Sequence, residues 1–394
     1  MTMAGERGAV DASGAAGVQI GDHGQQHNRF HLEVPRSIRV ALIAVLALAV
    51  LAAGGWAVVA LVLPQFAPTY KTEFLIDASA AADADGLAEI TESLRTVVGN
   101  SGDRDSLALR SFGGECGSDG NTTQLVDFGT GNRETISTAA KSVKGGGVAT
   151  LQRGIVQAIE DFSRPFAQDA KQVNRIVVVA RQGEDACDTD TAFVQREIGD
   201  RIAAAGLDIE FRVIGYRVAG DQQEQLALLA TGSGAPEPMF VETADDLNAA
   251  LEWFTNVEPV LRNAKAVIDV LNPTVDTVNE AVTAVGEGRL DVADRRLTAA
   301  RDGITAADTA FEDLDGRTGT AAAADLNRRA LLLKDLQRDV VESASTLLAD
   351  ARDGKPLGPG HDAFTGVANG YNAEVTAMNE ALAALRATAP EGVR

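Results

Sequence analysis

The longest apolar stretch of the chain runs from Val40 to Leu63 and contains no charged side chain. As a helix it would extend roughly 36 Å, enough to cross a hydrocarbon core of about 30 Å. A cleavable secretory signal would have a shorter apolar core and a shorter leader. Arginines precede the run, whereas Lys71 is the first base after it, which favours a cytoplasmic N-terminus. We therefore predict one transmembrane helix at residues 38–63, with everything beyond it outside the cytoplasm of a plasma membrane.

Beyond this run, apolar strands alternate with amphipathic helices. We predict strands at Glu73–Asp77, Ser106–Phe112, Thr123–Phe128, Arg175–Ala180, Ile209–Tyr216 and Met239–Val241. The predicted helices are Leu87–Val98, Arg133–Val143, Leu151–Phe166, Thr191–Ala205, Gln222–Thr231 and Ala244–Phe254. Apolar central strands separated by such helices are typical of an α/β, doubly wound sheet that is buried on both faces. In this architecture, ligands bind beyond the carboxyl ends of the strands.

After Pro259 the strand signal ends and apolar residues recur every three or four positions. Four such seams run over Leu261–Val285, Leu290–Leu314, Leu326–Leu347 and Phe364–Leu385. The segment Gly354–Gly360 is predicted to be the loop between the last two seams. Seams of this kind with short breaks predict an all-α helical bundle with coiled-coil packing over residues 258–394.

Composition narrows the classes of function. The net charge is −21, which argues against nucleic acid or an anionic lipid surface as a partner, because both require basic patches. No histidine occurs between residues 32 and 360, and no G-x-S-x-G, H-E-x-x-H or phosphate-loop motif is present. We therefore predict no enzymatic activity and no cofactor.

The two cysteines, Cys116 and Cys187, both follow the apolar run. In an oxidising compartment an even pair suggests one disulfide. In a cytosolic protein, two independent buried thiols would be the better interpretation.

The first 37 residues are predicted to be a cytoplasmic tail that is mostly disordered. Val18, Gln19, Ile20 and Gly21 break its polar composition and precede a tract rich in Gln, Asn and His. Stacked in register, the apolar pair could form a dry zipper while the amides form ladders. Residues 17–31 resemble the RIP homotypic interaction motif and the bacterial amyloid signalling motifs associated with NLR-type receptors in actinobacteria, although Gly24 stands where relatives carry Asn. The resemblance implies homotypic assembly of the tail.

Two other interpretations of the tail remain open. It could be a plain juxtamembrane linker, because short polar tracts match motifs by chance. His23, His27 and His31 could line one face of a helix and bind a metal ion. Gly21 and Gly24 oppose such a helix.

Residues 70–257 resemble a von Willebrand factor A (vWA) domain of bacterial secreted proteins. Leu75–Ser79 lies where that family ends its first strand with a D-x-S-x-S motif, and Phe211–Tyr216 and Leu228–Gly234 match its closing strand and the helix after it. Cys116 and Cys187 occupy two loops whose cysteines pair in such relatives. The resemblance implies a Rossmann-like fold, a Cys116–Cys187 disulfide and a binding function.

The metal-adhesion motif (MIDAS) of this family is incomplete. Asp77 and Ser79 are retained. The remaining ligand positions hold Ala81, Ala149 with Thr150 adjacent, and Gln182. Hard divalent ions require a nearly complete shell of oxygen ligands, so we expect a degenerate site. Weak Mg²⁺ binding would remain if Glu184 or Asp185 took over as a ligand after a loop shift.

Together these features predict a single-pass membrane protein whose extracytoplasmic vWA-like domain binds a protein or envelope ligand, as an adhesion module or scaffold. The alternative is a membrane effector of an NLR-type amyloid signalling pathway, triggered through the Val18–Gly21 motif.

Overall fold

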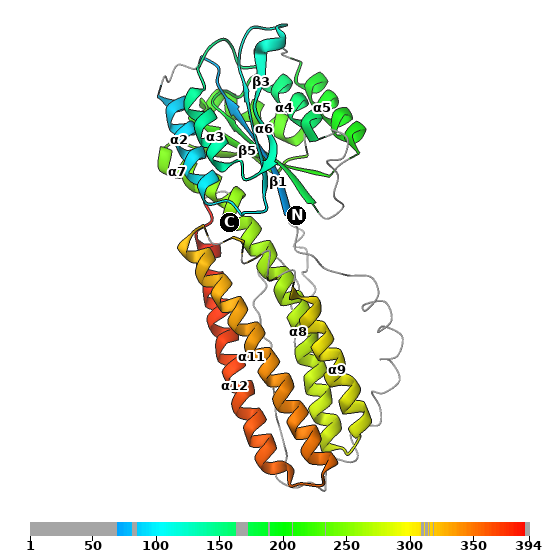
Figure 1. Ribbon diagram of the computed structural model, residues 1–394. Helices are drawn as coiled ribbons and strands as arrows, with labels where there is room; N and C mark the ends of the chain where they lie inside the picture. The colour runs from blue at the N-terminus through cyan, green and yellow to red at the C-terminus, as the bar shows by residue number, and fades with distance from the viewer. Residues whose placement is uncertain are drawn as a thin grey trace, which may run out of the picture. The chain divides into compact units, whose positions relative to one another are not determined.

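Figure 1 shows a computed structural model of the chain. The structure describes residues 69–390 apart from 81–84, 163–171, 188–189, 207, 233, 309–310, 312–313, 315 and 318. The predicted transmembrane helix at 38–63 and the predicted amyloid-type motif at Val18–Gly21 lie outside the described residues and stay predictions. Within the described part, no helix is both long and apolar enough for a membrane span.

A mixed sheet of six strands forms the centre of the first half. Its strands are β1 (Thr69–Asp77), β2 (Ser106–Phe112), β3 (Thr122–Thr130), β4 (Gln172–Ala180), β5 (Ile209–Tyr216) and β6 (Met239–Val241). The spatial order is β3-β2-β1-β4-β5-β6, and only β3 runs antiparallel to its neighbour. Strand β1, whose residues 70–77 are all buried, lies beside β4 at the centre, as expected for parallel strands covered on both faces. The predicted α/β class is confirmed.

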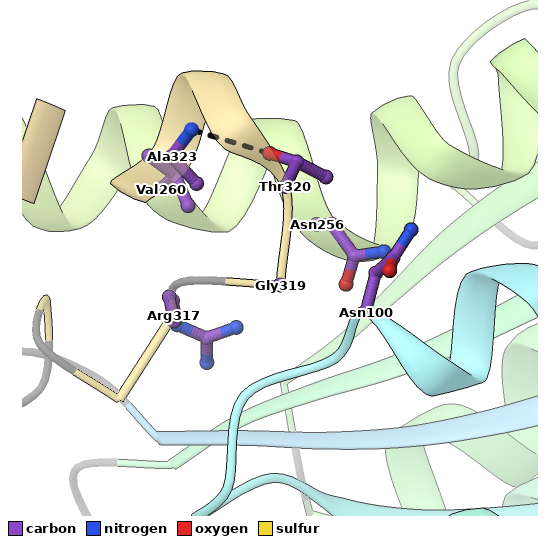
Figure 2. A pocket seen from close by; sticks show the side chains of 7 residues that line it. All are labelled: Asn100, Asn256, Val260, Arg317, Gly319, Thr320 and Ala323. Atoms are coloured by element: carbon purple, nitrogen blue, oxygen red, sulfur yellow. Dashed lines mark hydrogen bonds between the residues drawn. The ribbon is translucent and has the colours of Figure 1, made fainter. Parts of the chain in front are cut away.

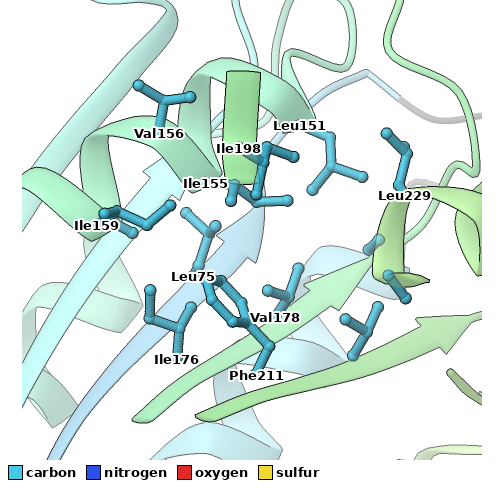
Figure 3. Close-up of a cluster of buried hydrophobic side chains, with 14 of the residues drawn as sticks. Leu75, Leu151, Ile155, Val156, Ile159, Ile176, Val178, Ile198, Phe211 and Leu229 are labelled. Atoms are coloured by element: carbon cyan, nitrogen blue, oxygen red, sulfur yellow. The ribbon is translucent and has the colours of Figure 1, made fainter. Parts of the chain in front are cut away.

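Helices cover both faces of this sheet (Figure 1). On one face, α2 (Gly86–Gly99) packs against α3 (Arg133–Ser142) and α7 (Ala244–Glu252). On the other, α5 (Thr191–Ala205) packs between α4 (Leu151–Phe162) and α6 (Gly220–Gly232). The apolar faces of α4, α5 and α6 meet the sheet in one buried cluster, in which Leu75, Val178 and Phe211 face Ile155 and Ile198 (Figure 3). Burial of this cluster supplies the main driving force for the fold.

Long helices follow the sheet. A five-residue π-helix, η2 (Trp253–Val257), joins α7 directly to α8 (Glu258–Gly286), and α9 (Leu290–Ala306), α11 (Ala321–Arg352) and α12 (Leu357–Ala387) come after it. Gln337 of α11 donates to the Leu271 carbonyl of α8 at 2.9 Å, and Arg329 of α11 pairs with Glu374 of α12 at 3.0 Å. The predicted C-terminal helices are confirmed.

Two details differ from the sequence-based prediction. The loop predicted at Gly354–Gly360 is shorter in the structure than in the prediction, because α12 already begins at Leu357. Pro359 then lies in the first turn, where a missing N–H costs no hydrogen bond. The predicted second seam ran unbroken to Leu314, but α9 ends at Ala306, while Phe311 and Leu314 are helical beyond that end.

The chain forms two compact units. One comprises Phe66–Ala266, Thr309–Arg328 and Ala381–Arg394, and the other includes Val267–Asp308 and Arg329–Glu380. Residues 309–328, which include the first turns of α11, thus belong to the unit that contains the sheet.

Candidate functional site

Asp77 lies at the carboxyl end of β1, where the vWA resemblance places a metal ligand. Its carboxylate is fully buried and accepts three hydrogen bonds. Oδ1 accepts from the backbone N–H and the hydroxyl of Ser79, at 2.8 and 2.5 Å, and Oδ2 accepts from the backbone N–H of Arg181 at 2.9 Å. The protein itself therefore supplies donors to both carboxylate oxygens.

Arg181 and Gln182 follow β4 and complete this arrangement. Arg181 is only 7% exposed, and its guanidinium donates to the Ser79 carbonyl. The Gln182 amide donates to the Ser79 hydroxyl at 3.1 Å, while that hydroxyl donates to Asp77. A fixed positive charge thus lies beside Ser79. In the sequence, Gln182 stands only as a lost ligand, and no motif signals the contribution of Arg181.

Thr150, the third candidate ligand, bonds elsewhere. Its hydroxyl donates to the Asn121 carbonyl at 2.6 Å and accepts from the Gly113 N–H at 3.0 Å. These bonds tie the start of α4 to the loop after β2. Ala81 lies outside the described residues.

Asp185, considered above as a replacement ligand, serves the N-terminus of α4 instead. Its carboxylate accepts from the Gln152 N–H in the first turn at 2.7 Å and from the Cys187 N–H at 2.8 Å. An acidic group at this position satisfies a free N–H and interacts favourably with the helix dipole.

The described residues do not fit a divalent cation. Mg²⁺ requires near-octahedral oxygen ligands, whereas the Asp77 oxygens and the Ser79 hydroxyl are already engaged by N–H and O–H donors. Nor does the described part of the chain contain a group of three or more His, Cys, Asp or Glu side chains that could hold a metal ion.

Glycines allow three loops to approach closely at this end of the sheet. Gly147 has a φ of 68°, and a Cβ there would lie 2.4 Å from Gly114. Gly113 has a φ of 128°, and a Cβ there would lie 2.6 Å from the Ser79 nitrogen. Gly114 and Val148 exchange two backbone hydrogen bonds, at 3.0 and 2.8 Å. This pairing holds Val148 at the surface, where it is 42% exposed.

A disulfide joins the outer parts of these loops. Cys116, in the loop after β2, is bonded to Cys187, in the loop after β4, and their Cα atoms are 5.3 Å apart. Both cysteines are exposed. The predicted pairing is confirmed. The exposed residues around the bond, which we name the carboxyl-end surface, are Glu115–Ser118, Lys144–Val148, Glu184, Ala186 and Cys187.

A second group of charges is buried beneath α4. Arg110 of β2 donates to Asp161 of α4 at 2.9 and 2.5 Å. Glu73 of β1 is fully buried nearby, 3.4 Å from the Arg110 Nε, and neither of its oxygens receives a hydrogen bond. Burial, together with the negative charge of Asp161, raises the pKa of Glu73 well above its ordinary value and outweighs the effect of Arg110. Its surroundings therefore favour the neutral form of Glu73.

At the opposite, amino end of the sheet, buried arginines that belong to no sequence motif make the contacts. Arg175 of β4 is fully buried, donates to the Phe254 carbonyl in η2 and pairs with Glu210 at 3.0 Å. In the same group of charges, Glu258 pairs with Arg212 at 2.7 Å. Burial raises the pKa of Glu258, but the neighbouring arginine charges outweigh it and lower that pKa overall. The sequence signal for this role of Arg175 was its place as a charged residue at the start of the apolar stretch Arg175–Ala180.

Comparison with known proteins agrees with this geometry. A mixed six-stranded sheet with helices on both faces defines an α/β fold. Residues 73–256 match the family model of the von Willebrand factor type A domain, so this region of the chain is a vWA domain. A search of curated protein sequences gave no match.

Similar solved structures include a pilus adhesin, SpaC from Lactobacillus rhamnosus GG, with 12% identity and a TM-score of 0.39 over 48% of this chain and 30% of that one. A von Willebrand factor type A protein from Catenulispora acidiphila has 14% identity and a TM-score of 0.37, covering 48% of this chain and 42% of that one. The vWF domain of the pilus tip protein Mfa5 from Porphyromonas gingivalis has 11% identity and a TM-score of 0.36, covering 48% and 94%. The match thus spans less than half of the first two proteins. At these TM-scores, the likenesses add nothing to the family assignment.

Proposed function

We propose that the vWA domain is a protein-binding module of the adhesion or scaffold type and that its partner contacts the carboxyl-end surface without a bridging metal ion. Membership of the vWA family supports a binding function, because domains of this family usually bind partners and are not enzymes. The observation that carries the proposal is the construction of this surface. Loops from three separate segments are fixed to one another by the disulfide and by glycine contacts, and they expose Val148.

Pre-organised loops of this kind lose little conformational entropy on binding. The surface also combines an apolar side chain with charges of both signs, Glu115, Glu184 and Lys144. Such a mixture suits a protein partner with a complementary polar rim around an apolar contact. In place of a metal ion, the Arg181 guanidinium keeps the Asp77–Ser79 loop in one conformation.

A comparison of two variants tests this proposal. Val148→Asp places a charge in the carboxyl-end surface, whereas Leu331→Asp changes a leucine on α11 that is 37% exposed. Pull-downs of partner proteins from the native envelope should recover the partner with wild-type protein and Leu331→Asp but not with Val148→Asp. Equal recovery with both variants would show that the partner does not bind at this surface.

The proposed location is the outer face of the plasma membrane, with residues 38–63 as the anchor. The exposed disulfide supports it, since such bonds persist in oxidising compartments. Protease added to intact cells should digest the chain beyond Gln65 and leave the first 39 residues protected. Protection of the C-terminal helices would refute this topology.

A further inference from the structure

The segment between α9 and α11 contributes a buried arginine to the vWA domain. We call residues 311–320 the strap; its described members are Phe311, Leu314, Gly316, Arg317, Gly319 and Thr320. We propose that the strap is a conformational latch, closed by Arg317 on Asp105, that holds the β1–β2 pair of the vWA domain in place. The proposal does not depend on what the carboxyl-end surface binds.

The ion pair of the latch is buried and has two contacts. Arg317 is 6% exposed and Asp105, just before β2, is 3% exposed. Arg317 Nη1 lies 2.9 Å from Asp105 Oδ2, and Nη2 donates to Oδ1. The Gly102 N–H adds a further bond to Oδ2 at 3.1 Å. Two parallel N–H···O bonds fix the guanidinium in one orientation.

Other contacts extend the latch to β1. The Arg317 Cζ lies 4.6 Å from the centre of the Tyr70 ring, at the start of that strand. The Arg175 Cζ lies 5.0 Å from the same ring. In addition, the Asp103 N–H donates to the Gly316 carbonyl at 3.2 Å. The strap therefore contacts the amino ends of both β1 and β2.

Glycines on both sides permit this close approach. A Cβ at Gly319 would lie 2.3 Å from the Asn100 carbonyl oxygen, and one at Gly102 would lie 3.1 Å from Arg317 Nη1. Beside them is a small cavity lined by Asn100, Asn256, Val260, Arg317, Gly319, Thr320 and Ala323 (Figure 2). Arg317 Nε and Asn256 Oδ1 are buried without a protein partner, a setting in which proteins hold ordered water.

The strands that the strap contacts at one end carry the candidate binding loops at the other. β1 leads from Tyr70 to Asp77, and β2 leads from just after Asp105 to just before Gly113. Removing Arg317 leaves the buried charge of Asp105 uncompensated, which is strongly destabilising. If the latch holds this strand pair, its loss must raise local opening along β1 and β2 and in the loops that follow them.

Hydrogen exchange of the full chain measures this opening. Arg317→Ala should make the slowest amides of β1 and β2 exchange about 100-fold faster, while amides of α9 and the middle of α12 keep their wild-type rates. Arg328→Ala is the matched control, because Arg328 is an exposed arginine of α11 whose side chain pairs within the helix with Asp325. It should leave both regions unchanged.

A second pair of variants tests the strap without removing a charge. Gly319→Ala forces a methyl group against the Asn100 backbone, whereas Gly366→Ala of α12 places one in open space. Gly319→Ala should reproduce the faster exchange of β1 and β2, and Gly366→Ala should not. If Arg317→Ala unfolds the vWA domain while α9 stays protected, the latch is supported. Faster exchange confined to the strap and residues 100–105, or equally fast exchange in α9 and α12, would overturn it.

Discussion

The two ends of the sheet are held together by different chemistry. At the carboxyl end, backbone groups, glycines and one disulfide join the loops, and N–H and O–H donors together with the nearby Arg181 guanidinium balance the charge of Asp77. At the amino end, buried arginine side chains make the contacts, with Arg175 reaching η2 and Arg317 reaching Asp105. Backbone contacts fix the shape of a surface, whereas long charged side chains connect segments that are distant in sequence.

This difference assigns the two ends different roles. The carboxyl end is a fixed surface that exposes Val148 and the disulfide. The amino end depends on ion pairs whose partners must all be present, because a buried charge that loses its partner is costly. We therefore expect substitutions at the amino end to destabilise the domain most, and changes at the carboxyl end to affect binding first.

The largest effect is expected for Arg175→Ala. The substitution removes the hydrogen bond to the Phe254 carbonyl and the pairing with Glu210, and it opens a cavity in a fully buried position. The free energy of unfolding should fall by about 3–5 kcal/mol. Denaturant unfolding followed by circular dichroism measures it. Arg201→Ala is the control, because Arg201 is exposed and pairs with Glu160 at 3.2 Å on the surface, so its loss should cost about 0.5 kcal/mol or less. Equal losses of unfolding free energy for the two variants would contradict the expectation that substitutions at the amino end destabilise the domain most.

The second-largest loss of stability is expected from removing the disulfide at the carboxyl end. The bond closes a loop between residues 71 positions apart, for which the chain-entropy model gives about 4 kcal/mol. A Cys116→Ser, Cys187→Ser double variant should therefore unfold at lower denaturant concentration, with a loss of about 2–4 kcal/mol. Non-reducing peptide mapping of the wild-type protein should recover the two cysteines in one linked peptide. Thiols that alkylate freely in the native protein would refute the bond.

Sequence patterns predicted the carboxyl end better than the amino end. Apolar runs located the six strands, and the spacing of Asp77, Ser79 and the cysteines located the loops, because these features are local or belong to a family motif. The contact between Arg317 and Asp105 joins residues 212 positions apart, and neither residue is part of a motif. Periodicity correctly marked Phe311 and Leu314 as helical and buried, but it gave no sign that α9 ends at Ala306 or that Arg317 lies near Asp105.

Glu73 should make stability depend on pH in a defined direction. Burial raises its pKa above the ordinary value of 4.5, so the folded protein keeps a proton that the unfolded chain releases. This proton stabilises the fold fully below about pH 4.5, and the contribution is lost as pH rises through the raised pKa. In Glu73→Gln the side chain stays neutral, so the variant should gain stability relative to wild type as pH increases over that range. Unfolding curves of both proteins at several pH values measure the difference in stability, and a difference that is constant or shrinks would contradict a raised pKa of Glu73.

The smallest effect is expected from divalent metal ions, and it tests how the carboxyl end balances its charge. Asp77 accepts from Ser79 and Arg181, and the Ser79 hydroxyl accepts from Gln182, so a cation would have to displace these donors before it gained a ligand. Calorimetry with Mg²⁺, Mn²⁺ or Ca²⁺ should therefore show no tight binding to the wild-type protein. Gln182→Asp sharpens the test, since it replaces one of the donors with a carboxylate while leaving Arg181 in place. If the Arg181 guanidinium supplies the positive charge that balances Asp77, Gln182→Asp should also bind no metal ion tightly. Micromolar binding by the wild-type protein that disappears in Asp77→Ala would show that the donors yield to a cation and that the site is a metal centre after all.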